Sequence, residues 1–186
     1  MSAAVDAGDI ERSLFVLTID DVRLEVDAAR GGRVTALRLG ERNLLSGAEV
    51  DQINYGSTFW TSPQSDWGWP PDVEIDSAPY AGAFDGEAIV LRGPASPRLG
   101  VSIEKRIEAD RARRAFVLSY RVRSHAAASI RVAPWEVTRV LPNGLTFFAA
   151  GAGTYAPTDL PAHDIGGITW VHHDASVITG HQKLFA

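Results

Sequence analysis

Two acidic residues, Glu136 and Asp66, stand beside tryptophans in segments that are otherwise apolar or rich in proline. Glu136 follows Pro134 and Trp135 within an apolar run, so partial desolvation would suit it to act as a general base. A plainer interpretation pairs Glu136 with Arg139, since such ion pairs are common and require no function. The two interpretations are compatible, because an Arg–Glu pair on a concave face also binds hydroxyl groups.

Three of the five tryptophans lie in the segment 54–80, together with four prolines and four acidic residues. No period of 2 or 3.6 runs through this segment, which predicts a stiff, irregular stretch that is neither a regular strand nor a helix. Indole planes beside polar groups suit a pyranose, whose C–H face packs on an aromatic ring. The candidate sugar contacts are Trp60, Gln64, Asp66, Trp67, Trp69, Trp135, Arg139 and Lys183.

These aromatic and acidic residues also have interpretations that involve no ligand. Most buried aromatic residues serve packing, so the three indoles of segment 54–80 could close one end of a β-sandwich core. Asp66 in such a loop often accepts hydrogen bonds from nearby backbone amides. Both interpretations remain open at the level of sequence.

Two histidines in the last quarter of the chain are candidate proton donors. Mutarotation requires a carboxylate and an acid on opposite sides of one sugar, and His163 or His181 could supply the acid next to Glu136. Histidines of this kind more often serve as surface or structural residues. His172 and His173 would point to opposite faces of a strand, so the pair cannot chelate one metal. The sequence therefore predicts no metal site and no cofactor.

The overall composition is that of an ordinary globular protein and shows no basic stripe. The 186 residues include 18 basic and 23 acidic side chains, for a net charge of −5, so a nucleic acid partner is not expected. Cysteine is absent, which excludes disulfides and thiolate chemistry. No apolar run of about 18 residues and no basic leader followed by an apolar stretch occurs. We therefore expect a cytoplasmic protein without membrane contact.

Short alternating runs separated by turn residues predict an all-β fold. In the run 22–26, Val22, Leu24 and Val26 share one face while the polar side chains share the other, which is typical of a half-buried strand. No segment has the pattern of a long amphipathic helix. The chain is expected to form one antiparallel β-sandwich over residues 13–186 after a flexible lead-in, residues 1–12. The expected strands are 14–19, 22–26, 33–39, 88–92, 100–107, 115–123, 129–141, 145–150, 168–171 and 177–179.

Four sequence stretches together resemble a known family. They are GGRVTALRLGERNLL (31–45), NYGSTFWTSPQSDWGWPP (54–71), SIEKRIE (102–108) and VAPWEVTRV (132–140). This combination is similar to bacterial proteins of the galactose mutarotase-like superfamily, in a branch known only as a domain of unknown function. The resemblance covers roughly residues 14–186 and implies a β-supersandwich with sugar on its concave face.

The resemblance implies less about catalysis than about fold. The chain is similar to the N-terminal two-thirds of the family fold, and the general base of aldose 1-epimerases lies in the remaining part. Their catalytic histidine motif matches none of the five histidines. An incomplete supersandwich leaves strand edges unpaired, so either a homodimer through these edges or poor solubility is expected.

Three functions therefore remain open. The first is a carbohydrate-binding protein without catalysis, which the missing base region favours. The second is a sugar epimerase in which Glu136 and a histidine transfer protons. The third is a structural or assembly domain in which the tryptophans belong to the core.

Overall fold

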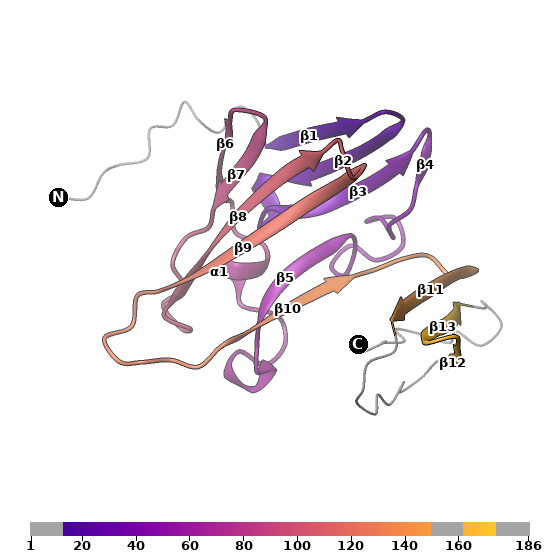
Figure 1. Ribbon diagram of the computed structural model, residues 1–186. Coiled ribbons are helices and arrows are strands. Elements are labelled where there is room, and N and C mark those ends of the chain that lie inside the picture. Colours follow the sequence, from indigo (N-terminus) through magenta and orange to yellow (C-terminus); the bar gives the residue numbers. More distant parts are fainter. Residues whose placement is uncertain (1–12, 150–161, 174–186) are drawn as a thin grey trace. The chain divides into compact units, whose positions relative to one another are not determined.

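The computed structural model describes residues 13–149 and 162–173. The chain divides into two compact units, residues 1–139 and 140–186, where the sequence pattern predicts a single domain. The regular secondary structure of the described part is mostly antiparallel strands, which confirms the all-β prediction (Figure 1). No helix in the described ranges is long and apolar enough to span a bilayer.

The larger sheet of the first unit has the strand order β1–β2–β3–β5–β10 (Figure 1). In its first two strands, buried side chains alternate with more exposed ones. This alternation explains why the bounds of these two strands agree with the sequence pattern. They are β1 (Leu14–Ile19), β2 (Val22–Asp27), β3 (Arg33–Leu39), β5 (Ser57–Ser62) and β10 (Ala133–Thr138), with the short β4 (Arg42–Asn43) paired to β3.

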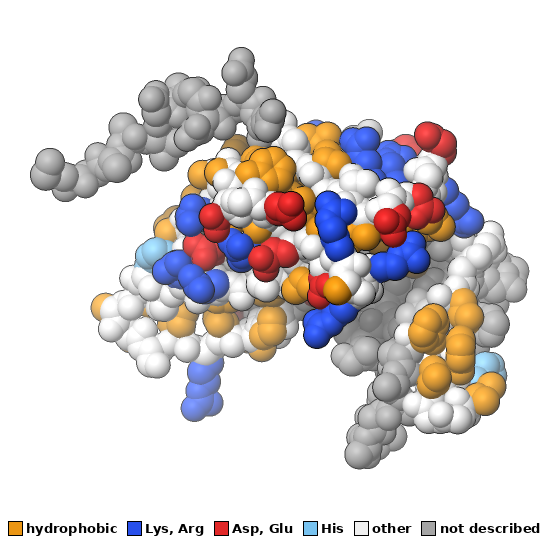
Figure 2. Space-filling view, turned by 45° about the horizontal axis from the view of Figure 1, so that its top comes forward, with side chains coloured by type: hydrophobic (Ala, Val, Ile, Leu, Met, Phe, Trp, Pro, Cys, Tyr) orange, Lys and Arg blue, Asp and Glu red, His pale blue; other side chains and the backbone are white. Residues whose placement is uncertain are grey.

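The second sheet of this unit runs in simple sequence order, as a meander of four strands. Its members are β6 (Ala81–Asp85), β7 (Ala88–Arg92), β8 (Val101–Asp110) and β9 (Ala115–Ser124). Apolar side chains from both sheets form one buried cluster, so the unit has a sandwich-like architecture. Figure 2 shows a face on which acidic and basic side chains are interspersed, so neither sign of charge dominates it.

An aromatic pair bridges the two sheets on each side of this sandwich. On one side Phe15 of β1 and Phe84 of β6 meet with ring centroids 5.5 Å apart. On the other side Phe59 of β5 stacks on Tyr120 of β9 at 4.1 Å, yet the inward-facing side chains of β9 remain only half-buried. Neither side is fully closed, since Phe84 is itself 44% exposed and most residues of β6 are exposed.

The prediction that segment 54–80 contains neither a strand nor a helix is wrong. Residues 57–62 form β5, and Val73–Asp76 form the short helix α1, preceded by a 3₁₀ turn at Gln64–Asp66. Five of the six residues of β5 are buried, so both of its faces are covered and the usual alternation of polar and apolar residues is absent. Because β5 is buried on both faces, its sequence lacks the alternation by which a strand is predicted.

Helix α1 packs between β5 and the turn that precedes β3. Strands β3 and β5 pair at a single position, Val34 opposite Ser57. Gly31, with φ of 66°, donates its N–H to the Ala78 carbonyl at 3.0 Å, and a side chain there would collide with the Asp76 carbonyl. This close approach requires glycine, and it brings the end of α1 against the beginning of β3.

The second unit, described by itself, contains a three-stranded antiparallel sheet in the order β11–β13–β12. The strands are β11 (Gly144–Ala149), β12 (Ala162–Ile165) and β13 (Ile168–His173). Thr169 and Val171 of β13 are buried, whereas Phe147 and Ile165 are exposed. The expected strand at 177–179 lies outside the described residues.

Candidate functional site

The candidate site begins with two tryptophans on neighbouring strands. Trp60 of β5 lies directly opposite Trp135 of β10 in the antiparallel ladder, so both rings project from the same face. Their ring centroids are 5.6 Å apart and the planes are nearly perpendicular, at 84°. Edge-to-face contact of this kind is a favoured geometry for aromatic pairs.

Two further tryptophans from the loop after β5 complete an indole cluster, defined as Trp60, Trp67, Trp69 and Trp135. Trp60 is its centre, with ring centroids 5.6 Å from Trp67 and 6.4 Å from Trp69. Trp67 is 2% exposed and Trp60 is 6% exposed, whereas Trp135 is half-buried and Trp69 is 57% exposed. The cluster therefore has a buried base and an exposed rim.

The buried base is held in place by hydrogen bonds of the indole N–H groups. Trp60 Nε1 donates to Asp76 Oδ1 at 2.8 Å, and Trp67 Nε1 donates to the Thr61 carbonyl at 2.7 Å. Pro71, Asp72, Ile75 and Leu99 pack around these two rings and leave no space for a water molecule. Both rings are thus fixed by packing and by a polar contact at one end.

Asp76 also binds the buried side chain of Arg33. Arg33 Nη2 lies 3.2 Å from each Asp76 carboxylate oxygen, while Nη1 donates to the Ile53 carbonyl at 2.7 Å. The guanidinium carbon sits 4.4 Å from the centre of the Tyr55 ring. A charged pair buried to this degree persists only when both partners are well bonded. Arg33 and Asp76 were not among the candidate site residues, and the acidic character of α1 was the only sequence signal for Asp76.

Arg139 lies at the other end of the same face. Its backbone N–H donates to the Gly56 carbonyl at 3.0 Å, which continues the ladder between β5 and β10. The guanidinium carbon is 5.3 Å from the centre of the Trp60 ring, and Nη1 donates to Thr58 Oγ1 at 3.2 Å. Burial and the neighbouring charge of Arg33 lower the pKa of Arg139 to about 10, against the opposing effect of Asp76 and Asp51.

Gln64 and Asp66 lie in the turn between β5 and Trp67. The Gln64 side chain donates to the Gly68 carbonyl at 3.3 Å, a contact within the loop itself. Asp66 is exposed, and its carboxylate lies 3.5 Å from the hydroxyl of Ser65, while its backbone carbonyl accepts a bond from Arg98. Among the described residues the Asp66 carboxylate therefore accepts from a hydroxyl rather than from the backbone amides considered in the sequence analysis.

Glu136 faces away from the indole cluster. It pairs with Phe59 in the ladder, one position from Trp135, so its side chain projects from the opposite face of β10. Its carboxylate accepts a hydrogen bond from Ser57 Oγ at 2.7 Å. Burial, followed by the charge and hydrogen bond of Glu136, raises the pKa of Tyr120 above its ordinary value. The structure thus places Glu136 and Arg139 on different faces, because they are three positions apart on an extended chain.

A buried lysine lies between the two sheets, near Glu136. Lys105 of β8 donates through Nζ to the carbonyls of Gly31 and Gly32, at 2.7 and 3.0 Å. Burial lowers the pKa of Lys105 to about 8, and the nearby charge of Glu136 acts in the opposite direction. Lys105 shares its strand face with apolar residues in the sequence, and that position was the available signal of a buried cation.

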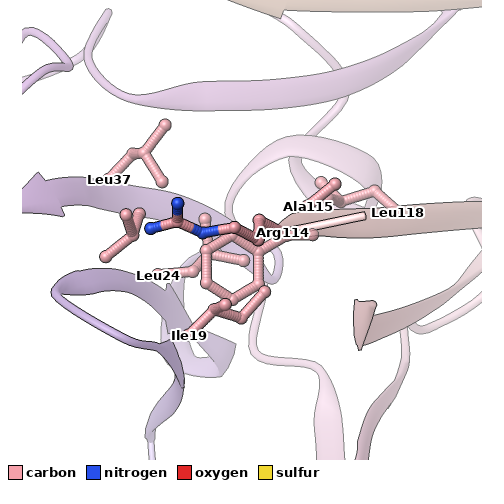
Figure 3. A pocket seen from close by; sticks show the side chains of 8 residues that line it. Ile19, Leu24, Leu37, Arg114, Ala115 and Leu118 are labelled. Carbon is pink, nitrogen blue, oxygen red and sulfur yellow. The ribbon is translucent and has the colours of Figure 1, made fainter. Parts of the chain in front are cut away.

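An apolar pocket lies elsewhere between the sheets, at the ends of β1, β2, β3 and β9. It has a volume of about 310 Å³ and is open to solvent. Figure 3 shows the guanidinium of Arg114 extending over its aliphatic walls, and this group pairs with Asp20 at 3.0 Å. The pocket is lined by Ile19, Val22, Leu24, Leu37, Arg114, Ala115, Phe116 and Leu118, none of which was a candidate site residue.

The remaining candidates belong to the second unit. His163 lies on β12, is exposed, and sits opposite Trp170 of β13 in the ladder. His181 and Lys183 lie outside the described residues. No group of three or more metal-binding side chains occurs within residues 13–149 and 162–173.

Comparison of the chain with known protein families, with curated proteins and with solved structures gives no match.

Proposed function

We propose that the chain binds carbohydrate on the exposed rim of the indole cluster. The observation that carries this proposal is the 57% exposure of Trp69 on a base of indoles that are themselves buried and hydrogen-bonded. A large apolar ring is normally withdrawn from solvent, and an exposed one on a rigid support is a common feature of binding surfaces. Half-buried Trp135 and Arg139 flank the same central ring.

The rigid support matters for affinity. Trp69 contacts the edge of Trp60 at an interplanar angle of 80°, and Trp60 is held by Asp76. A ring that is already ordered loses little conformational freedom when a ligand stacks on it. The C–H face of a pyranose supplies the apolar contact, and the Arg139 guanidinium supplies hydrogen-bond donors to ring substituents.

The resemblance to galactose mutarotase-like proteins points to the same class of ligand and, as a proposal, to a supersandwich fold. The epimerase alternative gains no support from the described geometry, because Glu136 projects away from the indole cluster. The structural alternative accounts for Trp60 and Trp67, whose burial is required by packing in either case. It does not account for Trp69.

A fluorescence titration tests this proposal directly. Neutral and acidic monosaccharides and short oligosaccharides are added to the full chain, and tryptophan emission and heat of binding are recorded. We expect saturable binding that Trp69→Ala abolishes without changing the circular dichroism spectrum. Phe84→Ala, which truncates another exposed aromatic residue, should leave binding intact. If no carbohydrate binds to the wild-type chain, the proposal is overturned and the structural alternative stands.

A further inference from the structure

The Arg139 guanidinium is held beside the indole cluster, and the described residues leave most of its donors unused. Its only hydrogen bonds in the described part of the chain come from Nη1, to Thr58 Oγ1 at 3.2 Å and to the Val137 carbonyl at 3.4 Å. Both acceptors are neutral. A guanidinium carries five N–H donors in a planar fork, so Nε and Nη2 remain available.

Arg139 differs in this respect from its buried neighbour. Arg33 forms a two-oxygen contact with the Asp76 carboxylate, so its charge is compensated. Arg139 makes no ion pair with any carboxylate of the described residues, although it is half-buried. Burial and the charge of Arg33 lower the pKa of Arg139, and the charges of Asp76 and Asp51 offset only part of this lowering. A half-buried cation that no described carboxylate contacts directly gains most from a ligand that is an anion.

The position of this cation relates it to the sugar surface. Trp135, Val137 and Arg139 occupy every second position of an extended chain, so their side chains share one face of β10 and its continuation. The Trp60 ring contacts Trp69 and Trp135 and lies beneath the Arg139 guanidinium at 5.3 Å. A pyranose that stacks on the exposed rim of the cluster would present a ring substituent to this guanidinium.

We propose that the site prefers carbohydrates that carry a carboxylate, namely hexuronic acids and oligosaccharides that contain them, over their neutral counterparts. The planar fork of a guanidinium matches the two oxygens of a carboxylate, and such charge-assisted pairs are stronger than bonds to hydroxyl groups. Trp69 and Trp135 provide the stacking surface, and Arg139 provides the selectivity. This preference rests on the proposed carbohydrate binding.

The matched probes are methyl glucuronide, its neutral methyl ester and methyl glucoside, with the corresponding galacturonide series. Calorimetric titration of the full chain at low and high salt gives each affinity. We expect the free acid to bind about tenfold more tightly than the ester or the glucoside, a difference that decreases as salt increases. Arg139→Gln should reduce the affinity for the acid to that for the neutral sugars. Arg123→Gln, which removes an exposed arginine of β9, is the control.

The outcomes separate this preference from the underlying function. If neither acidic nor neutral sugars bind, the proposed carbohydrate binding fails. If the acid and its ester bind equally and Arg139→Gln changes neither affinity, the preference alone is overturned. The comparison of acid and ester on the wild-type chain decides the question even if the Arg139 variant does not fold.

Discussion

The Asp76 carboxylate binds the Trp60 indole N–H at 2.8 Å and thereby links helix α1 to the centre of the indole cluster. The same carboxylate neutralises Arg33, whose guanidinium is almost fully buried. The support for the proposed sugar surface and the pairing of a buried charge therefore depend on one side chain.

Replacing Asp76 by Asn should strongly destabilise the first unit. The amide oxygen can still accept the Trp60 N–H, but the Arg33 charge becomes uncompensated in the interior. Loss of one partner of a buried ion pair costs about 3 to 5 kcal/mol. Urea denaturation followed by circular dichroism measures the change, with Asp85→Asn, at an exposed ion pair, as the control. A loss below about 1 kcal/mol would show that the Arg33 charge finds other compensation.

Truncating Trp67 and truncating Trp69 should change the free energy of unfolding by very different amounts. Trp67 is buried and bonded to the Thr61 carbonyl, so Trp67→Ala should lower the free energy of unfolding by about 3 to 5 kcal/mol. Trp69 is exposed, so Trp69→Ala should change it by only about 0.5 kcal/mol. Denaturation midpoints of the two variants measure this contrast. Equal losses would mean that Trp69 is a packing residue, against the proposed function.

Sequence patterns predicted most strands of the first unit but not the arrangement of the indole cluster. Strands such as β2 could be predicted because one face is buried and the other open, which imposes alternation. The burial of β5 on both faces removes that signal. The contact of Asp76 with Arg33 joins residues 43 positions apart, and no local pattern encodes it. Likewise, the opposite orientation of Glu136 and Trp135 follows only once β10 is known to be extended at these residues.

Glu136→Gln should leave sugar affinity unchanged, because the side chain projects from the face of β10 opposite to Trp135. Polarimetry should likewise show no acceleration of glucose or galactose mutarotation by the wild-type chain. The matched variant is Arg139→Gln, which alters the indole face instead. A mutarotation rate above that of buffer, abolished by Glu136→Gln, would instead support the epimerase alternative.

The outer edge of β9 is expected to pair with a second copy of the chain. In the described residues β9 pairs only with β8, and its inward-facing apolar side chains are half-buried. Antiparallel self-pairing with Ser119 on the two-fold axis places Val117 opposite Arg121 of the partner subunit and keeps like charges apart. Sedimentation of the full chain over a concentration series should then show a dimer.

Charge substitutions at Val117 test this register. Val117→Arg should weaken the dimer by placing two arginines opposite each other, and Val117→Glu should strengthen it. A nonspecific effect of charge at an exposed position would act in the same direction in both variants. A wild-type chain that remains monomeric at all concentrations would contradict the expected pairing.

Stability should increase with pH between about 8 and 9.5 because of Lys105. Burial lowers the pKa of Lys105 to about 8 in the folded chain, against 10.5 for an ordinary lysine. In this range the unfolded chain binds more protons than the folded chain, so the free energy of unfolding rises, by up to about 1.4 kcal/mol per pH unit. Tyr80 and Tyr120 have raised pKa values, and their opposing effect begins only near pH 10. Urea denaturation at each pH measures the slope.

Lys105→Met provides the control for this pH dependence. The variant leaves the Gly31 and Gly32 carbonyls without their donor, so its stability at any one pH is lowered. The slope with pH is a separate quantity and should disappear, because the variant no longer carries the Lys105 charge. An equal slope in wild type and variant would show that the Lys105 charge is not suppressed by burial between the sheets.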